Sequence, residues 1–195
     1  MLTPEILDTF RALLAEAGAA GDPEPTAMTL ATADDNGRVS ARIVLLKGVD
    51  ADGFRFFTNY TSSKAEQIAR HPRAALCFHW KTLRDGVQVR VEGAVEALTP
   101  ADSDAYFATR PRLSQVGAWA SLQSQTLPDR AIFEQRVAQY EREFAGREVP
   151  RPPHWGGYRV VPDRVEFWYG AQFRLHERVQ WERVDGRWQR RELYP

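Results

Sequence analysis

The chain has 195 residues, and its 26 Lys and Arg residues balance its 26 Asp and Glu residues, so the formal net charge is zero. This length suits one domain with a sizeable core, and we predict a single domain over residues 1–195. Balanced charge argues against a general nucleic-acid or membrane-surface binder, because both classes favour a basic surplus. The one cysteine, Cys77, excludes an intrachain disulfide and argues against a structural zinc site. No stretch could span a bilayer and the acidic N-terminal segment is no signal peptide, so we expect a cytoplasmic protein.

Residues 3–18 are predicted to form an amphipathic helix, with Thr3 as its N-cap and Pro4 at its first position. Strands are expected at 27–33 and 38–47, joined by an Asn36-Gly37 turn, because Asn-Gly tolerates the positive φ angles of a tight hairpin.

The rest of the chain continues this mainly β pattern with flanking helices. Residues 48–53 are expected to form a turn. Further strands are predicted at 54–59, 74–80 and 87–98, and a C-terminal meander over 158–195 has strands at 158–161, 165–169, 174–183 and 187–194. Helices are predicted at 63–70, from Thr99-Pro100 to Pro111, and from Leu127-Pro128 to Gly146. Hairpins without a βαβ pattern predict an antiparallel, Greek-key-like sheet that closes into a barrel.

One candidate anion site combines Arg42 with the start of the helix at 63–70. Ser63 and Glu66 have the spacing of a capping box, and Lys64 lies in the first turn. A helix N-terminus offers free N–H groups to a phosphate. An ordinary capped helix is the alternative.

A second candidate site joins Lys47 to Tyr106, Arg110 and Ser114. Arg42 and Lys47 enclose four aliphatic residues and should face opposite sides of a regular strand, so they should contact different groups. Tyr106 and Arg110 are four apart on one predicted helical face. Ordinary surface charges are the alternative here.

The stretch from Arg174 to Arg178 is interpreted as a strand on which Arg174, His176 and Arg178 share one face. Two fixed positive charges beside an imidazole repel one another, and an anionic ligand on that face would relieve the repulsion. A solvated strand face with glutamates nearby is the competing interpretation.

Short motifs follow one another along the chain: Arg42 to Lys47, Thr58-Asn59, Ser62 to Gln67, Arg110 to Arg112 with Ser114 to Trp119, Gln123-Ser124, Trp155-Gly156-Gly157, Glu166 to Trp168, and Arg174 to Arg178. In this order they resemble the motifs of the pyridoxine (pyridoxamine) 5′-phosphate oxidase family, from about Thr26 to Pro195. The resemblance implies a dimeric FMN-binding split β-barrel with FMN at the subunit interface. It also implies oxidation of pyridoxamine or pyridoxine 5′-phosphate to pyridoxal 5′-phosphate, with O2 reduced to H2O2 and ammonia released from the amine.

The resemblance also assigns residues to roles. FMN contacts are implied for Arg42, Ile43, Val44, Leu45, Leu46, Lys47, Phe57, Thr58, Ser63, Lys64, Gln88, Gln123, Ser124, Trp168 and Arg178. Substrate contacts are implied for Lys47, Tyr106, Arg110, Ser114, Arg174, Leu175 and His176. Arg174 and His176 would be the catalytic pair above the pyridine ring, and Gln123 and Ser124 would reach in from the partner subunit. No metal is implied.

The sequence departs from the family pattern at several points. Ser63 stands where Arg is frequent, Phe57 where Tyr is usual, and the turn before Gln88 is two residues longer. The family's N-terminal arm has no match before Thr3. Two alternative functions are a split-barrel oxidase of the phenazine-pathway type and a non-catalytic flavin- or haem-binding module.

Overall fold

The computed structural model describes all 195 residues and contains nine strands, five α-helices and one 3-10 helix. The strands are β1 (Ala27–Ala33), β2 (Val39–Leu45), β3 (Gly48–Asp50), β4 (Gly53–Asn59), β5 (Arg73–Trp80), β6 (Val87–Ala97), β7 (Trp155–Tyr169), β8 (Glu177–Val184) and β9 (Arg187–Leu193). The helices are α1 (Pro4–Ala19), α2 (Ser63–Arg70), α3 (Pro100–Ala108), α4 (Arg112–Ala120), α5 (Arg130–Glu143) and the 3-10 helix η1 (Gln172–Arg174). None of these helices has the length and apolar character needed to cross a bilayer.

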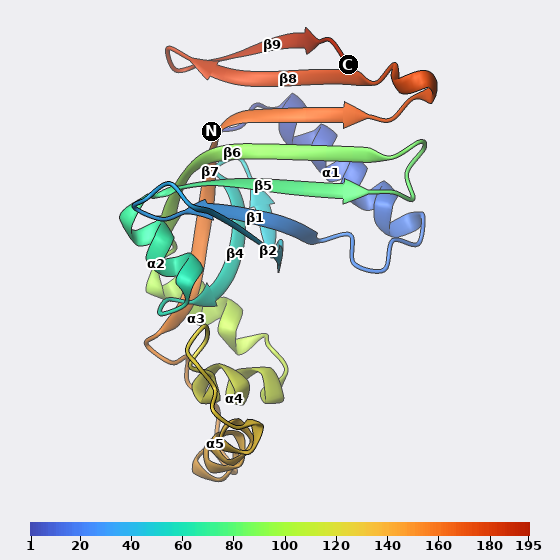
Figure 1. Ribbon diagram of the computed structural model, residues 1–195. Helices are drawn as coiled ribbons and strands as arrows, with labels where there is room; N and C mark the ends of the chain where they lie inside the picture. The colour runs from blue at the N-terminus through green and yellow to red at the C-terminus, as the bar shows by residue number, and fades with distance from the viewer.

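The strands form one antiparallel sheet in the order β2-β1-β5-β6-β7-β4-β3, which divides at β7 (Figure 1). The first part of β7, residues 155–160, pairs with β4, whereas its last part, residues 164–169, pairs with β8. Strand β6 follows β7 along both parts. The sheet therefore curves into a half-barrel on the β4 branch and leaves β8 and β9 as a separate branch, which confirms the antiparallel split-barrel fold.

A bulge allows β7 to pass through Pro162 as one strand, where we expected two. The register between β6 and β7 shifts between Glu92 and Gly93. A Cβ at Gly93 would lie 2.0 Å from the carbonyl oxygen of Val161, so only glycine permits this close backbone approach.

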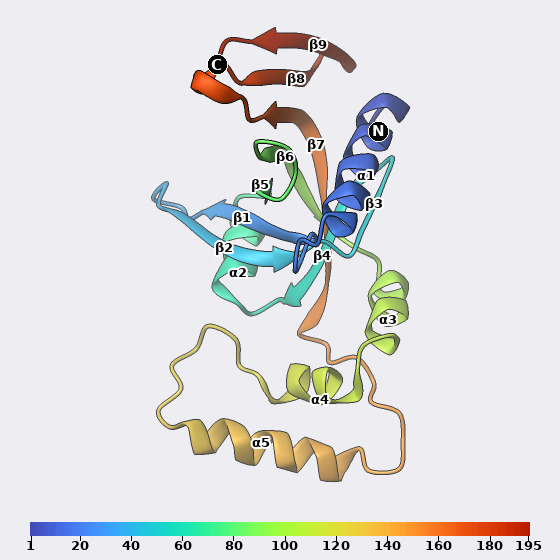
Figure 2. The same ribbon diagram turned by 90° about the vertical axis from the view of Figure 1, so that its right-hand side faces the viewer.

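The main core lies between α1 and the curved sheet. The Phe10 ring of α1 contacts the rings of Phe54 and Phe78 with centroid distances of 4.9 and 5.0 Å. The predicted cap is confirmed, because Thr3 Oγ1 accepts a hydrogen bond from the N–H of Ile6 at 3.3 Å. Helix α1 thus fills the inside of the half-barrel (Figure 2).

A smaller apolar cluster lies outside the barrel, where α3, α4 and α5 gather beyond one end of β4 and β7 (Figures 1 and 2). Its buried members include Phe107, Val116, Phe144 and Trp155. This cluster fixes α3 and α4 beside the start of β7.

Local structure also differs from the sequence-based expectations in four further places. Residues expected as a turn contain the short strand β3, and Ser62 rather than Ser63 is the N-cap residue of α2. Arg110, expected inside a helix, lies beyond the end of α3, and Ser114 lies in the separate helix α4.

The fourth difference concerns Arg174 to Arg178, whose first half is not a strand. Phe173 and Arg174 have φ angles of 56° and 63°, and β8 begins only at Glu177. These left-handed residues break the alternation, so Arg174, His176 and Arg178 do not share a strand face.

Replacing Phe10 by Ala should lower the free energy of unfolding by about 3–5 kcal/mol, because it leaves a cavity among the rings of the main core. Urea denaturation measures this loss. Asp8→Ala, an exposed change on the same helix, should shift stability by no more than about 0.5 kcal/mol. Similar losses in the two variants would contradict this account of the core.

Candidate functional site

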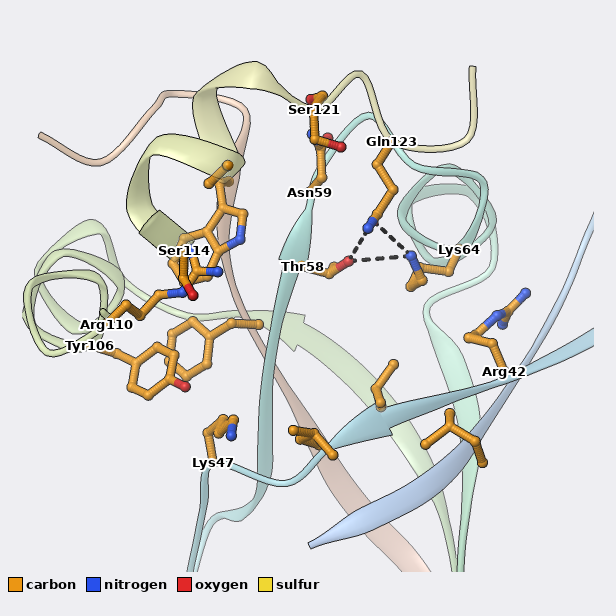
Figure 3. A pocket seen from close by; sticks show the side chains of 17 residues that line it. Arg42, Lys47, Thr58, Asn59, Lys64, Tyr106, Arg110, Ser114, Ser121 and Gln123 are labelled. Carbon is orange, nitrogen blue, oxygen red and sulfur yellow. Dashed lines mark hydrogen bonds between the residues drawn. The ribbon is translucent and has the colours of Figure 1, made fainter. Parts of the chain in front are cut away.

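A cavity of about 570 Å³ opens between β2, β4, α2 and α4 (Figure 3). Its lining contains four cationic side chains, Arg42, Lys47, Lys64 and Arg110, and no carboxylate. None of the four forms an ion pair elsewhere in the chain. Uncompensated positive charge in a hollow favours an anionic ligand.

Lys64 is held at one end of this cavity by neutral oxygens. Its Nζ donates to Gln123 Oε1 at 2.9 Å, to Ser62 Oγ at 3.2 Å and to Thr58 Oγ1 at 3.3 Å. Figure 3 shows Thr58, Lys64 and Gln123 converging there, with Arg42 beside them. Burial, together with the positive charge of Arg42, lowers the pKa of Lys64.

Arg42 is fixed from behind by β1. Its Nη1 donates to Thr32 Oγ1 at 2.6 Å and to the carbonyl oxygen of Leu30 at 3.2 Å. Thr32 is only 3 % exposed, and its hydroxyl donates to Gln67 Oε1 of α2 at 2.5 Å. Burial lowers the pKa of Arg42. Neither Thr32 nor Gln67 was predicted as a site residue. Gln67 ends the motif from Ser62 to Gln67, whereas a buried Thr in a strand gives no functional signal.

The other end of the cavity holds Lys47, Tyr106, Arg110 and Ser114, as predicted for the second cluster (Figure 3). Arg42 and Lys47 line one cavity, yet they belong to different clusters, because β2 ends at Leu45 and the chain then turns. The Arg110 side chain makes no hydrogen bond, and its Nη1 is buried without a partner. Burial lowers the pKa of Arg110. A phosphate would satisfy such donors.

Several predicted residues take other positions. Leu46 is buried in the main core rather than lining the cavity. Ser63 and Ser124 lie next to the cavity, where the N–H of Ser63 donates to Ser124 Oγ at 3.2 Å. Gln123 and Ser124, which the resemblance has reaching in from a partner subunit, contact β4 and α2 of their own chain, and Gln123 lines the cavity of that chain.

A second group of predicted residues lies together where β6 begins, β7 ends and β8 begins, at the end of these strands that is far from the cavity. Gln88 pairs with Trp168 across β6 and β7, and Trp168 pairs with Arg178 across β7 and β8. The His176 ring lies 4.5 Å from the Trp168 ring, and its Nδ1 accepts from the N–H of Ala171 at 3.1 Å. Arg178 Nε donates to Glu166 Oε1 at 2.8 Å.

These far-end residues do not reach the cavity of their own chain. Neither they nor the neighbouring Arg174 and Leu175 line it. Strand β7 carries Trp155 at the cavity and Trp168 in the far group, 13 residues later, a contour length of about 40 Å at roughly 3.3 Å per residue. One chain therefore presents the predicted site as two separate halves.

The cavity also contains residues that were not predicted as site residues: Asn59, Gly117, Ala118, Ser121 and Trp155. Asn59, Gly117, Ala118 and Trp155 belong to the motifs named in the sequence analysis, and these motifs were the signal that could have identified them; Ser121 lies outside every motif.

Comparisons with known proteins show which family this chain is similar to. A family model described as pyridoxamine 5′-phosphate oxidase matches residues 10–143, and one described as the pyridoxine 5′-phosphate oxidase C-terminal dimerisation region matches residues 155–195. A pyridoxine/pyridoxamine 5′-phosphate oxidase of Xanthomonas euvesicatoria is 56% identical over 100% of this chain and 98% of its own length.

Two solved structures are also similar. PhzG from Burkholderia lata, in complex with tetrahydrophenazine-1-carboxylic acid, has a TM-score of 0.92 and 31% identity over 100% of this chain and 98% of that one. A pyridoxamine 5′-phosphate oxidase-related, FMN-binding protein from Nostoc punctiforme has a TM-score of 0.75 and 20% identity over the full length of both chains, and supports the fold alone.

Replacing Lys64 by Met should not lower the free energy of unfolding in the absence of anions, because it removes a partly buried charge near Arg42. Inorganic phosphate at about ten times its dissociation constant should stabilise the unsubstituted protein by about 1.4 kcal/mol, and the variant by much less. Urea denaturation at constant ionic strength measures both. Lys81→Met, at an exposed lysine, is the control and should respond to phosphate as the unsubstituted protein does.

The response to phosphate should also depend on pH. Because the pKa of Lys64 lies below that of an unfolded lysine, the folded chain binds fewer protons between the two values, and this group makes stability rise with pH there. A bound anion favours the charged lysine, so phosphate stabilisation should fall as the pH rises through the lowered pKa of Lys64 toward the ordinary lysine value. Thermal unfolding with and without phosphate measures the trend, which should be weaker in Lys64→Met. If Lys64→Met shows the same pH dependence of phosphate stabilisation, that dependence arises from a group other than Lys64.

Proposed function

The chain belongs to the pyridoxine/pyridoxamine 5′-phosphate oxidase family, and we propose that it oxidises pyridoxamine or pyridoxine 5′-phosphate to pyridoxal 5′-phosphate, using FMN and O2. It is an oxidoreductase of this family. The observation that carries the proposal is the carboxylate-free cavity with a cationic cluster at each end. FMN and the substrate each bring one phosphate, so two clusters are needed.

The two clusters suit the two phosphates in different ways. Arg42 and Lys64, with the hydroxyl of Thr58, would hold the phosphate of FMN beside the start of α2. Lys47, Tyr106, Arg110 and Ser114 would bind the phosphate of the substrate. The unpartnered Nη1 of Arg110 supports this assignment, since a buried donor without a partner costs free energy until a ligand accepts from it.

The far-end residues would complete the site of a second copy of the chain. The segment matched by the dimerisation model, residues 155–195, includes the strands that carry Trp168 and Arg178. In a two-fold dimer each copy gives its far end to the cavity of the other. We therefore propose a homodimer with two sites, each built from both subunits.

When bound, FMN would supply the redox chemistry, in which C4′ of the substrate is oxidised by loss of a hydride and a proton and O2 is reduced to H2O2. The protein orients the reactants. Arg174 and His176 would hold the pyridine ring and its phenolic oxygen from above. Gln88 and Trp168 would contact the ring system of the cofactor, and Arg178 would stabilise negative charge that develops there. The amine substrate additionally takes up water and releases ammonia.

The structure shows what surrounds two of the residues that depart from the family pattern, Phe57 and Ser63. Phe57 lacks the usual tyrosine hydroxyl, but its ring packs on Tyr106 with a centroid distance of 4.0 Å. At Ser63, where Arg is frequent, the backbone N–H is bound by Ser124. The FMN phosphate would then depend on Arg42 and Lys64 for its positive charge.

A related activity on a tricyclic substrate is the alternative that the PhzG similarity favours. The assay that separates the two measures H2O2 release from pyridoxine 5′-phosphate with added FMN. A yellow protein with flavin absorbance and steady turnover supports the proposal, whereas FMN binding without turnover contradicts it. A Soret band in place of flavin absorbance would favour a haem-binding module.

Arg174→Met should reduce kcat by roughly a hundredfold while FMN occupancy changes little, because this residue orients the substrate. Steady-state kinetics measures kcat, and flavin absorbance measures FMN occupancy. Equal loss of turnover and FMN in Arg174→Met would contradict its assignment.

Arg110→Ala should mainly raise KM, because it removes a phosphate contact. Steady-state kinetics measures this change in KM.

Mixed dimers test whether the two halves come from different subunits. Co-expression of Arg110→Ala and Arg174→Met chains should produce heterodimers in which one site carries both substitutions and the other carries none. Purification through two different affinity tags should then give about half of the unsubstituted activity. If the heterodimer is no more active than either parent, the site is not shared.

A further inference from the structure

The guanidinium of Arg110 is held in place without any hydrogen bond or ion pair. Its Cζ lies 4.6 Å from the centroid of the Trp155 ring and 5.5 Å from that of Phe107. Its Nη1 is buried and has no hydrogen-bond partner. Arg110 follows the end of α3, where its backbone N–H donates to the carbonyl oxygen of Phe107 at 3.1 Å, but no hydrogen bond holds its side chain. The ring contacts are what remains to orient the side chain.

Trp155 is itself rigidly placed. It begins β7, is 6 % exposed, and its carbonyl oxygen accepts from Arg151 Nη1 at 2.6 Å. Its ring is nearly parallel to those of Phe57 and Tyr106, with interplanar angles of 12° and 10°. A Cβ at Gly157 would lie 2.7 Å from the Phe57 ring, so this residue must be glycine for the rings to pack as they do.

An aromatic ring and a carboxylate both attract a guanidinium, but only the ring leaves the N–H donors of the guanidinium free for another partner. A carboxylate would bind the guanidinium N–H groups and cancel its charge, whereas a ring attracts the cation through its quadrupole and uses none of the five donors. Arg110 is thus positioned while its donors stay available to an anion in the cavity. Lys47 is close enough to the same cluster to add charge, but no ring holds it (Figure 3).

We propose that Trp155 is a positioning residue that holds Arg110 toward the substrate's phosphate and so sets the affinity for phosphorylated substrates. This inference rests on the proposed function, because the anion in question is that phosphate. Trp155 acts through Arg110 and touches no reacting atom in this scheme. Its effect should therefore appear in KM and leave kcat nearly unchanged.

Trp155 also belongs to the smaller apolar cluster, so a purely structural role is the competing explanation. Trp119 supplies a matched control: it packs on Phe144 of the same cluster and does not contact Arg110. Its Nε1 donates to the carbonyl oxygen of Pro150 at 2.7 Å, and neither residue lines the cavity. Trp119→Leu removes the same bulk from the cluster without removing the ring beneath Arg110.

The first experiment compares kinetics with pyridoxine 5′-phosphate. Trp155→Leu should raise KM about tenfold with kcat within about twofold, and Trp155→Phe, which keeps a weaker ring, should lie between. Trp119→Leu should leave KM unchanged even where it lowers stability. An unchanged KM in Trp155→Leu, or an equal rise in Trp119→Leu, would overturn the proposal. If Trp155→Leu does not fold, Trp155→Phe carries the same comparison.

A double-mutant cycle gives the sharper test. In an Arg110→Ala background, Trp155→Leu should have no further effect on KM, because the cation that it positions is gone. If the double variant raises KM by the product of the two single-variant increases, Trp155 acts independently of Arg110 and the proposal is overturned.

A binding measurement separates this inference from the proposed function. In Lys64→Met protein, where the second cluster becomes the main anion site, inorganic phosphate should raise the melting temperature, and adding Trp155→Leu should remove most of that rise. If the unsubstituted protein binds phosphate this way but oxidises no pyridoxine 5′-phosphate, the proposed function fails while the role of Trp155 stands. An undiminished rise in the double variant overturns the role of Trp155.

Discussion

Positive charge without a neutralising carboxylate is the constraint around which this molecule is arranged. Four cationic side chains line one cavity, and burial lowers the pKa of Arg42, Lys64 and Arg110. The fold tolerates them by surrounding the charged groups with neutral oxygens and aromatic faces. Such contacts fix positions but leave charge uncompensated, so a doubly charged anion such as a phosphate ester gains more there than in water.

The division of the sheet at β7 connects this cavity to the rest of the protein. One end of the strand lies beside α3 and α4, and the other end pairs with β8 at the opposite end of the barrel (Figure 1). The continuous strand keeps the two ends apart, and the bulge at Gly93 lets it bend without ending. Under the proposed function, such a chain completes its site by pairing with another copy, and β8 and β9, which lie in the segment matched by the dimerisation model, form the branch available for that pairing.

Much of the local structure was predictable from the sequence. The Thr3 cap and the helix at 63–70 were confirmed, and a turn containing Asn36-Gly37 joins β1 to β2, although only Gly37 has a positive φ angle. Each of these features depends on residues within a few positions of one another. The left-handed Phe173 and Arg174 were not predictable, since neither residue type favours positive φ. The surrounding structure holds them there, and a strand was the reasonable local interpretation.

The sequence by itself determined the chemistry of the site: which cations and hydroxyls are available, and the family whose motifs they follow. Only the tertiary structure decided how they are grouped. It brought Gln123 to Lys64 of its own chain, placed Arg110 on the ring of Trp155, and separated the Trp168 group from the cavity. These contacts join residues tens of positions apart, and they depend on how packed elements meet in space, which no local pattern of residues specifies.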